Sequence, residues 1–297
     1  MIDWSLGSLA GMLILAPAIP GIAGKTKSWL TGRRGPPVLQ LYWDLLRLLR
    51  KGIVYSTTTT WVFRLAPVGA VMTPLLAACL LPLDGHEAVA SFTGDFVGFA
   101  GLLALGRFLL VLAALDTGSS FEGMGASRDA TFASFIEPAL FLSFVVLTLA
   151  TGQTSLSGML VAAPAPSLVM VAVSLFFVLL AEASRVPVDD PATHLELTMI
   201  HEVTVLDHSG PDLALLLYGA ALRMELFAAL PVGVLVFHAG FAPPLALALL
   251  VAGTVVVASV VGVVESSMAR LRLSRVPQFL VAATVLASLG VILQLLS

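Results

Sequence analysis

Cysteine is almost absent from this chain of 297 residues, where Cys79 is the only thiol. An iron–sulfur cluster usually takes four cysteine thiolates, so the chain cannot ligate one by itself. Any such redox centre must therefore belong to another polypeptide. The sequence also lacks a recognisable serine or cysteine nucleophile motif of the kind that covalent catalysis uses. We identify no catalytic residue in this chain.

Charged residues are also scarce. They make up 11% of the chain against 58% hydrophobic residues, and the mean hydropathy is +1.01. A soluble domain has about a quarter charged residues, so the composition predicts an all-α, polytopic integral membrane protein with one membrane domain, 1–297. Apolar runs of roughly 20 residues, enough to cross a bilayer, predict eight transmembrane helices at about 4–24, 65–83, 95–115, 130–150, 165–183, 212–238, 243–264 and 276–296.

Lysine and arginine are missing from every second connection between these predicted spans. Thirteen of the 15 basic residues lie in the first, third, fifth and seventh connections, and the other two, Arg107 and Arg223, lie inside predicted spans. Cytoplasmic loops of membrane proteins are enriched in Lys and Arg. The pattern therefore predicts that these four connections face the cytoplasm and that both termini lie outside.

The first cytoplasmic connection contains a predicted amphipathic helix at about 38–51. Leu41, Leu45, Leu48 and Leu49 recur at helical spacing, and charged residues take much of the remaining surface. This pattern is typical of a helix that lies in the membrane interface, with its basic side toward lipid headgroups or a partner. A helix that is simply solvated in the cytoplasm is the alternative.

Titratable residues gather in one segment, EASRVPVDDPATHLELTMIHEVTVLDHSGPD, residues 182–212. It holds seven of the 18 acids and three of the five histidines, with Arg185 as its one basic residue. Asp190 followed by Pro191 is typical of an N-cap with proline at the first helical position. We therefore expect a helix at about 191–206, within a structured, acidic cytoplasmic cap at 184–211.

A metal site does not fit the histidines of this cap. His194, His201 and His208 are spaced by seven residues, a rise of about 10.5 Å along a helix, whereas zinc holds each ligand at about 2 Å. The stretch HEVTV also lacks the second histidine of an HExxH motif. We expect no metal site in the chain.

Proton transfer fits the acidic cluster better. Crowded, partly desolvated carboxylates raise one another's pKa toward neutrality, and histidines titrate there already. A charge at bilayer depth costs about 2.5–3.5 kcal/mol, so an acid retained there is a functional candidate. The proton-path candidates are Glu137, Glu182, Asp189, Glu196, Glu202, Asp207, Glu225, Glu265, His194, His201 and His208. The alternative is structural pairing, of Glu225 with Arg107 or Arg223. Likewise, Glu182 could pair with Arg185 one helical turn on.

Three stretches resemble the heel subunit of respiratory complex I. AEASRVPVDDPATHLEL resembles its loop between the fifth and sixth helices, which reads approximately AE-x-N-R-x-P-F-D-x-P-E-A-E-S-E-L. RRGPPVLQLYWDLLRLLRK resembles its first loop, with Arg34, Asp44 and Lys51 at matching positions, and MARLRLSRVPQFL stands where it has a basic loop. The resemblance covers essentially the whole chain and implies eight helices with both termini outside.

A sister group is more similar still. HLELTMIHEVTVLDHSGPDLALL and VESSMARLRLSRVPQFLV resemble the membrane subunits of formate hydrogenlyase, hydrogenase 4 and related group 4 nickel–iron hydrogenases. The departures from the complex I subunit point the same way. His194 stands where that subunit has glutamate, Ser184 replaces an asparagine, and about three residues are added between Glu196 and Ser209. These changes favour a site that does not bind quinone.

The resemblance implies a membrane-anchoring, proton-coupling subunit of a membrane-bound hydrogenase, not an enzyme by itself, in the cytoplasmic (inner) membrane of a bacterium or archaeon. The expected partners are large and small hydrogenase subunits, a ferredoxin-like iron–sulfur subunit and antiporter-like membrane subunits, with the nickel–iron centre and iron–sulfur clusters in those partners. Ion-pair and docking candidates are Arg34, Asp44, Lys51, Arg107, Arg185, Arg223, Arg270, Arg272 and Arg275. A quinone-binding heel subunit and a purely structural anchor are the alternatives, and no nucleic-acid partner is expected.

Overall fold

The structure is a computed structural model that describes residues 2–161, 165–190 and 199–296. Its α-helices are α1 (Ile2–Leu15), α2 (Ala18–Leu30), α3 (Gln40–Leu49), α4 (Trp61–Leu80), α5 (Asp95–Asp116), α6 (Ser120–Thr151), α7 (Leu156–Met159), α8 (Pro166–Glu182), α9 (His201–Thr204), α10 (Gly210–Val236), α11 (Pro243–Ser267) and α12 (Val276–Leu296). The described residues contain no strand. The chain is thus an all-α polytopic membrane protein, as its composition predicts.

Fewer than the eight predicted spans are long and apolar enough to cross a membrane among the described residues. Six described helices meet both criteria, α4, α5, α6, α10, α11 and the 24-residue run that ends in α12, and a seventh span results if α1 and α2, bent by 46°, count as one. The segment predicted as the fifth span forms α8, which has only 17 residues. That length is the lower limit for a helix that crosses a bilayer.

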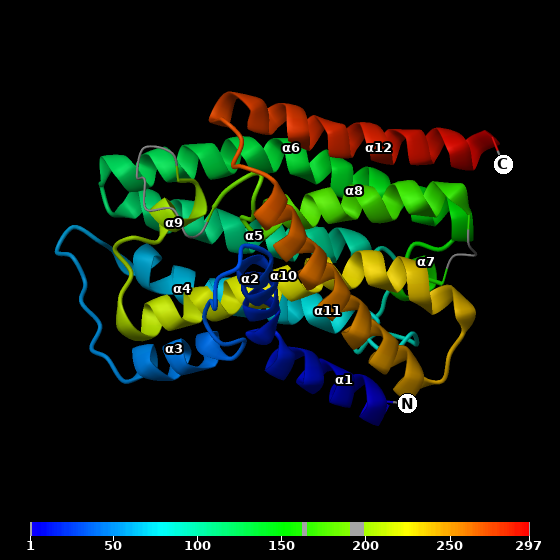
Figure 1. Ribbon diagram of the computed structural model, residues 1–297, viewed down its shortest axis with the longest axis horizontal. Coiled ribbons are helices and arrows are strands. Elements are labelled where there is room, and N and C mark those ends of the chain that lie inside the picture. Colours follow the sequence, from blue (N-terminus) through cyan, green and yellow to red (C-terminus); the bar gives the residue numbers. More distant parts are fainter. Residues whose placement is uncertain (1, 162–164, 191–198, 297) are drawn as a thin grey trace.

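Helix α10 occupies the centre of the bundle. Within its apolar stretch 78% of the residues are buried, against 28% for α11 and 22% for α12, and it packs against α2, α3, α4, α8 and α11. Figure 1 shows α3 and α9 at the left end of the bundle and both chain termini toward the right. That both termini face outward stays a prediction.

The break between α1 and α2 follows from Pro17, which has no N–H to donate to the carbonyl of Leu13 four residues earlier. The Tyr218 hydroxyl on α10 donates to that carbonyl at 3.0 Å. The Tyr42 hydroxyl on α3 donates to the next carbonyl, that of Ile14. Two tyrosines from other helices thus satisfy the backbone groups that the bend leaves open.

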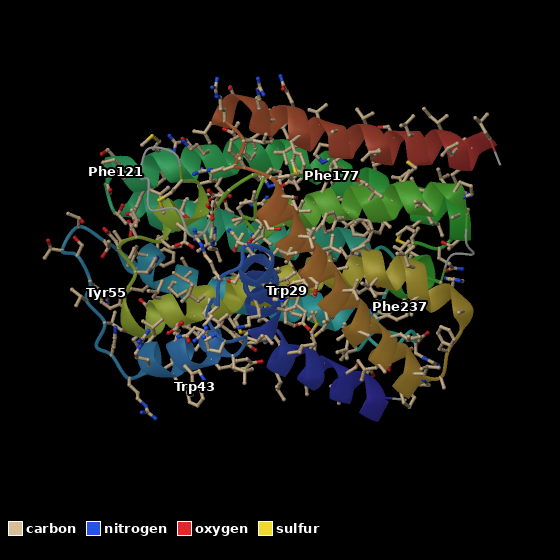
Figure 2. All side chains as sticks on the ribbon, viewed as in Figure 1. Trp29, Trp43, Tyr55, Phe121, Phe177 and Phe237 are labelled. Carbon is tan, nitrogen blue, oxygen red and sulfur yellow. The ribbon has the colours of Figure 1, made fainter. Side chains whose placement is uncertain are left out.

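The amphipathic helix predicted at 38–51 is confirmed as α3. No residue of α3 is buried, and Trp43, Leu46 and Leu49 expose 63%, 49% and 54% of their surface. Figure 2 shows Trp43 on the outer edge of the bundle, at the same end as Tyr55. An apolar, tryptophan-bearing face beside charged residues is typical of a helix at a membrane interface.

The acidic cap differs from its prediction. Residues 191–198 lie outside the described part of the chain, and of the remaining predicted helix only His201–Thr204 is helical. This short α9 packs closely on α6, which begins ten residues before the predicted span. A Cβ at Gly125 of α6 would lie 2.2 Å from Val203, so the glycine permits the close contact. Tertiary packing on α6 therefore holds the described segment 201–204 in place.

Candidate functional site

Three transmembrane helices bring two arginines and one carboxylate together. Arg107 of α5 donates to Glu182 at the end of α8, and Arg223 Nη1 of α10 lies 3.7 Å from the second oxygen of Glu182. The Glu182 side chain is only 5% exposed. Arg223 also donates to the carbonyl of Leu103 at 2.8 Å. The carboxylate is thus held between two cations deep in the bundle.

Helix α6 adds two more acids to Arg107. The guanidinium lies 3.7 Å from Asp129 and 3.8 Å from Glu137. Asp129 was not among the predicted site residues, because it was expected in a loop just before the span predicted at 130–150. Its signal was the spacing of eight residues from Glu137, which on one continuous helix puts both carboxylates on neighbouring faces. The exposed fraction of the Glu137 side chain is 47%, so this end of the cluster reaches the flank of the bundle.

A second ion-pair cluster joins α2, α11 and the segment after α8. Glu265, with 2% of its side chain exposed, lies 3.3 Å from Arg185 and 3.5 Å from Lys27. Lys27 in turn lies 3.9 Å from Asp190. The predicted alternative that Glu182 pairs with Arg185 is therefore wrong. The chain turns out of the helix at Ala183, which directs Arg185 toward α11 instead.

Asp189 organises the described part of the cap. Its carboxylate accepts from the backbone N–H groups of Ile200 at 3.1 Å and His201 at 3.0 Å. Arg270, from the connection between α11 and α12, lies 3.0 Å from the same side chain. Leu271 N–H donates to the Pro187 carbonyl at 3.0 Å, which joins the two connections further. Asp189 therefore fixes the position of His201.

Three cavities meet around Glu182 and His201. The cap cavity, about 160 Å³, lies beneath the cap; its lining includes Leu41, Arg185, His201, Glu202 and Met224. The linking cavity, about 40 Å³, is lined by Glu182, Ser184, His201 and Arg223, among others. The flank cavity, about 240 Å³, is lined by Arg107, Glu137, Glu182 and Phe227, among others. Each has room for water, which needs roughly 10–15 Å³, so water and carboxylates can form one polar route.

The other histidine described in the cap lies apart from this route. His208 is 4% exposed, and its ring stacks on that of Phe63 at 3.8 Å. Neither ring nitrogen has a hydrogen-bond partner among the described residues. Burial lowers the pKa of His208 to about 4, so the ring is neutral at pH 7. Asp207 precedes His208 in the chain, and its backbone N–H donates to the Glu122 carboxylate at 3.1 Å.

Several predicted residues lie elsewhere. Glu225 forms no ion pair with Arg107 or Arg223 among the described residues. Both arginines pair with Glu182 instead. His194 and Glu196 lie outside the described residues. Arg34, Lys51, Arg272 and Arg275 are exposed, and Asp44 pairs with Arg47 at 2.7 Å on the surface of α3. Within the described part of the chain, no three His, Cys, Asp or Glu residues are grouped closely enough to hold a metal ion.

The sequence family agrees with this architecture. The family model described as NADH dehydrogenase matches residues 5–296. The chain belongs to this family. Among curated members, Hydrogenase-4 component C of Escherichia coli K12 is 32% identical over 86% of this chain and 82% of its own length. Formate hydrogenlyase subunit 4 of the same organism is 31% identical over 90% of both chains.

More distant relatives share the fold. NADH-ubiquinone oxidoreductase chain 1 of Triticum aestivum is 26% identical over 78% of this chain and 75% of its own length. A chain in the solved structure of the membrane-bound sulfane sulfur reductase, an archaeal respiratory membrane complex, superimposes with a TM-score of 0.81 over 98% of both chains, at 20% identity. The resemblance stated from the sequence motifs is thereby confirmed.

Proposed function

We propose that this chain is the membrane-anchoring and proton-coupling subunit of a membrane-bound hydrogenase complex of the formate hydrogenlyase or hydrogenase-4 type. Its relatives at 31–32% identity are subunits with those names and match it over most of their length. The observation that carries the coupling role is the series of cavities around Glu182, which extends from beneath the cap to Glu137 on the flank of α6. A chain that only anchored a partner has no use for such a route.

The proposed complex has its redox centres in other subunits. Large and small hydrogenase subunits and a ferredoxin-like subunit hold the nickel–iron centre and the iron–sulfur clusters, and the chain is a non-catalytic subunit. This arm docks on the end of the bundle that carries α3 and α9, and it also contacts the exposed basic residues Arg272 and Arg275 of the α11–α12 connection. Antiporter-like subunits lie beside the bundle, within the cytoplasmic membrane of a bacterium or archaeon, and both termini face outward.

Coupling proceeds through the proton occupancy of acids that share cations. A charge change in the arm shifts the proton on Glu202 or His201, which line the cap cavity. Water carries the change to Glu182. When Glu182 takes up a proton, its hold on Arg107 weakens, and Arg107 turns to the α6 carboxylates that it already contacts at 3.7 and 3.8 Å. Glu137 then passes the change to the neighbouring membrane subunit.

The test uses Glu137→Gln in the complex reconstituted into vesicles. Glu137 is half-exposed, so the substitution removes its charge at little structural cost. We expect proton translocation to be nearly abolished, while hydrogen evolution from an artificial donor continues. The matched control is Glu87→Gln, because Glu87 is an exposed acid in the α4–α5 connection. Equal loss of both activities would assign Glu137 to assembly and contradict the coupling role.

The cap cavity keeps a second candidate function open. About 160 Å³ of space bordered by Leu41, Leu217 and Met224 also fits a quinone headgroup, and NADH-ubiquinone oxidoreductase chain 1 belongs to the same family. Identifying the proteins that co-purify with the chain separates the two. A partner with hydrogen-evolving activity supports the hydrogenase assignment, whereas a flavin-bearing, NADH-oxidising module, with electron flow blocked by a quinone-site inhibitor, supports the other.

A further inference from the structure

Glu225 lies outside the ion-pair clusters, near the middle of α10. It is 3% exposed, and its Oε2 atom has no hydrogen-bond partner among the described residues. It stands two positions after Arg223, and a helix turns about 100° per residue. Glu225 therefore points to nearly the opposite side of α10, away from Arg107 and Glu182. No cation of the described chain lies within ion-pair distance of it.

The Glu225 side chain borders a small space between α1, α10 and α11, which we call the Glu225 chamber. The chamber holds about 20 Å³, and its lining includes Ser8, Met12, Glu225, Leu250 and Thr254. Its volume suffices for one water molecule. Apart from the carboxyl group, the lining side chains offer only two polar atoms, the hydroxyl oxygens of Ser8 and Thr254. Both residues are buried, with 1% and 2% of their surface exposed.

Both hydroxyl groups have already used their protons. Ser8 Oγ donates to the carbonyl of Ser5 at 2.9 Å, and Thr254 Oγ1 donates to the carbonyl of Val251 at 2.9 Å. Their oxygens therefore face the chamber as acceptors. An ionised carboxylate has only acceptor atoms, whereas a protonated one carries an O–H donor. The chamber is chemically matched to a protonated Glu225 and mismatched to an ionised one.

The nearby tyrosines do not alter this match. The hydroxyls of Tyr42 and Tyr218 both donate to backbone carbonyls of α1, so neither proton is available to Glu225. The sodium sites of many secondary transporters use backbone carbonyls from unwound helix segments. Ser8, Glu225 and Thr254 all lie inside continuous helices.

We infer that Glu225, Ser8 and Thr254 form a proton-binding site within the membrane, separate from the Glu182 route. The Glu225 carboxyl holds its proton at neutral pH and donates it to a Ser8 or Thr254 oxygen, directly or through one water. Glu265 provides the contrast within the same chain, since it is equally buried but held by two cations. The site stands whether or not the chain couples proton movement to electron transfer.

Infrared difference spectroscopy of the complex in membranes tests this site. The wild-type spectrum minus that of Glu225→Gln, at neutral pH, should contain the C=O stretch of a protonated carboxylic acid, shifted in heavy water. The same difference for the exposed acid Glu87→Gln should contain only carboxylate bands. Carboxylate bands alone for Glu225 would overturn the proposal. Conversion of the protonated band to carboxylate bands by added sodium would replace the proton by sodium and overturn it too.

The hydroxyl partners have their own test. Ser8→Ala and Thr254→Val each remove one acceptor from the chamber while keeping the volume of the side chain similar. We expect the C=O band of Glu225 to shift in at least one of the two variants and in the double variant. An unchanged band in all three would show that these hydroxyls do not receive the proton, and would overturn the proposed site.

Discussion

Buried charge in this chain is arranged around shared partners. Arg107 contacts carboxylates from α6 and α8, and Glu182 contacts arginines from α5 and α10. An unpaired charge at bilayer depth costs about 2.5–3.5 kcal/mol, so each of these residues depends on the others. Arg107 has three carboxylates within reach, those of Asp129, Glu137 and Glu182, which allows a proton to change its pairing without exposing a charge.

His208 gives the cap a dependence on pH. Burial against Phe63 lowers its pKa from 6.5 to about 4. The unfolded chain therefore binds a proton near pH 6.5, whereas the folded chain does so only near pH 4. Well above pH 6.5, His208 has no effect on the free energy of unfolding. As the pH falls from 6.5 through 4, that free energy decreases, and the total loss is roughly 3 kcal/mol. We expect His208→Phe to remove this part of the acid sensitivity.

Measuring unfolding of the purified protein across that pH window checks this. His86, exposed in the α4–α5 connection, supplies the control, and His86→Phe should keep the acid sensitivity of the wild type. If His208→Phe and the wild type lose stability in parallel between neutral pH and pH 4, His208 is not the group responsible.

At the scale of elements, one proline is compensated by tyrosines on two other helices. Pro17 leaves the Leu13 carbonyl without its helical donor, and Tyr218 supplies one at 3.0 Å. We expect Tyr218→Phe to cost about 1–3 kcal/mol of unfolding free energy, the penalty of a buried acceptor left unsatisfied. In a Pro17→Ala background the new N–H serves that carbonyl, so the same substitution should cost less.

A double-mutant cycle on the detergent-solubilised protein measures this coupling. Tyr42→Phe is the matched control, because Tyr42 donates to the Ile14 carbonyl, whose helical donor is residue 18 and not residue 17. Its cost should be similar in both backgrounds. A Tyr218→Phe cost that does not depend on residue 17 would contradict the account of the bend.

Helices were predictable where length and apolarity determine them, and not where packing does. Four of the predicted spans correspond to α4, α5, α10 and α11, because a helix needs about 20 apolar residues to cross a bilayer. Helix α3 was predictable because the leucines in its sequence recur at helical spacing. In the described part of the cap, only His201–Thr204 of the helix predicted to reach residue 206 is helical. This part of the cap is held by Asp189, through Arg270 at 3.0 Å and two backbone N–H groups. Such partners lie far apart in the sequence, so local patterns do not reveal them.

The same limit applied to the site. The sequence indicated that Glu182 and Glu265 were candidates because acids are rare at bilayer depth. It could not assign their partners, since Arg107 stands 75 residues from Glu182 and Arg185 stands 80 residues from Glu265. Asp129 was missed because the predicted span began at 130, ten residues after the start of α6 at Ser120.

At the scale of the whole molecule, the basic residues and the fold make one orientation testable. The connection that carries α3 and the connection between α4 and α5 follow opposite ends of α4, and only the first is rich in Lys and Arg. Cys79 is the only native thiol, so Cys79→Ser provides a background free of thiols. Gly52→Cys and Glu87→Cys then place single thiols at exposed positions in the two connections.

In right-side-out vesicles, a membrane-impermeant maleimide should label Glu87→Cys at once and Gly52→Cys only after permeabilisation. The expected result follows because Lys and Arg favour the cytoplasmic side, which places Gly52 inside and both termini outside. The reverse labelling pattern would invert the topology. It would also move the cap cavity to the outer surface, where a cytoplasmic hydrogenase arm could not reach it, and the proposed function would fail with it.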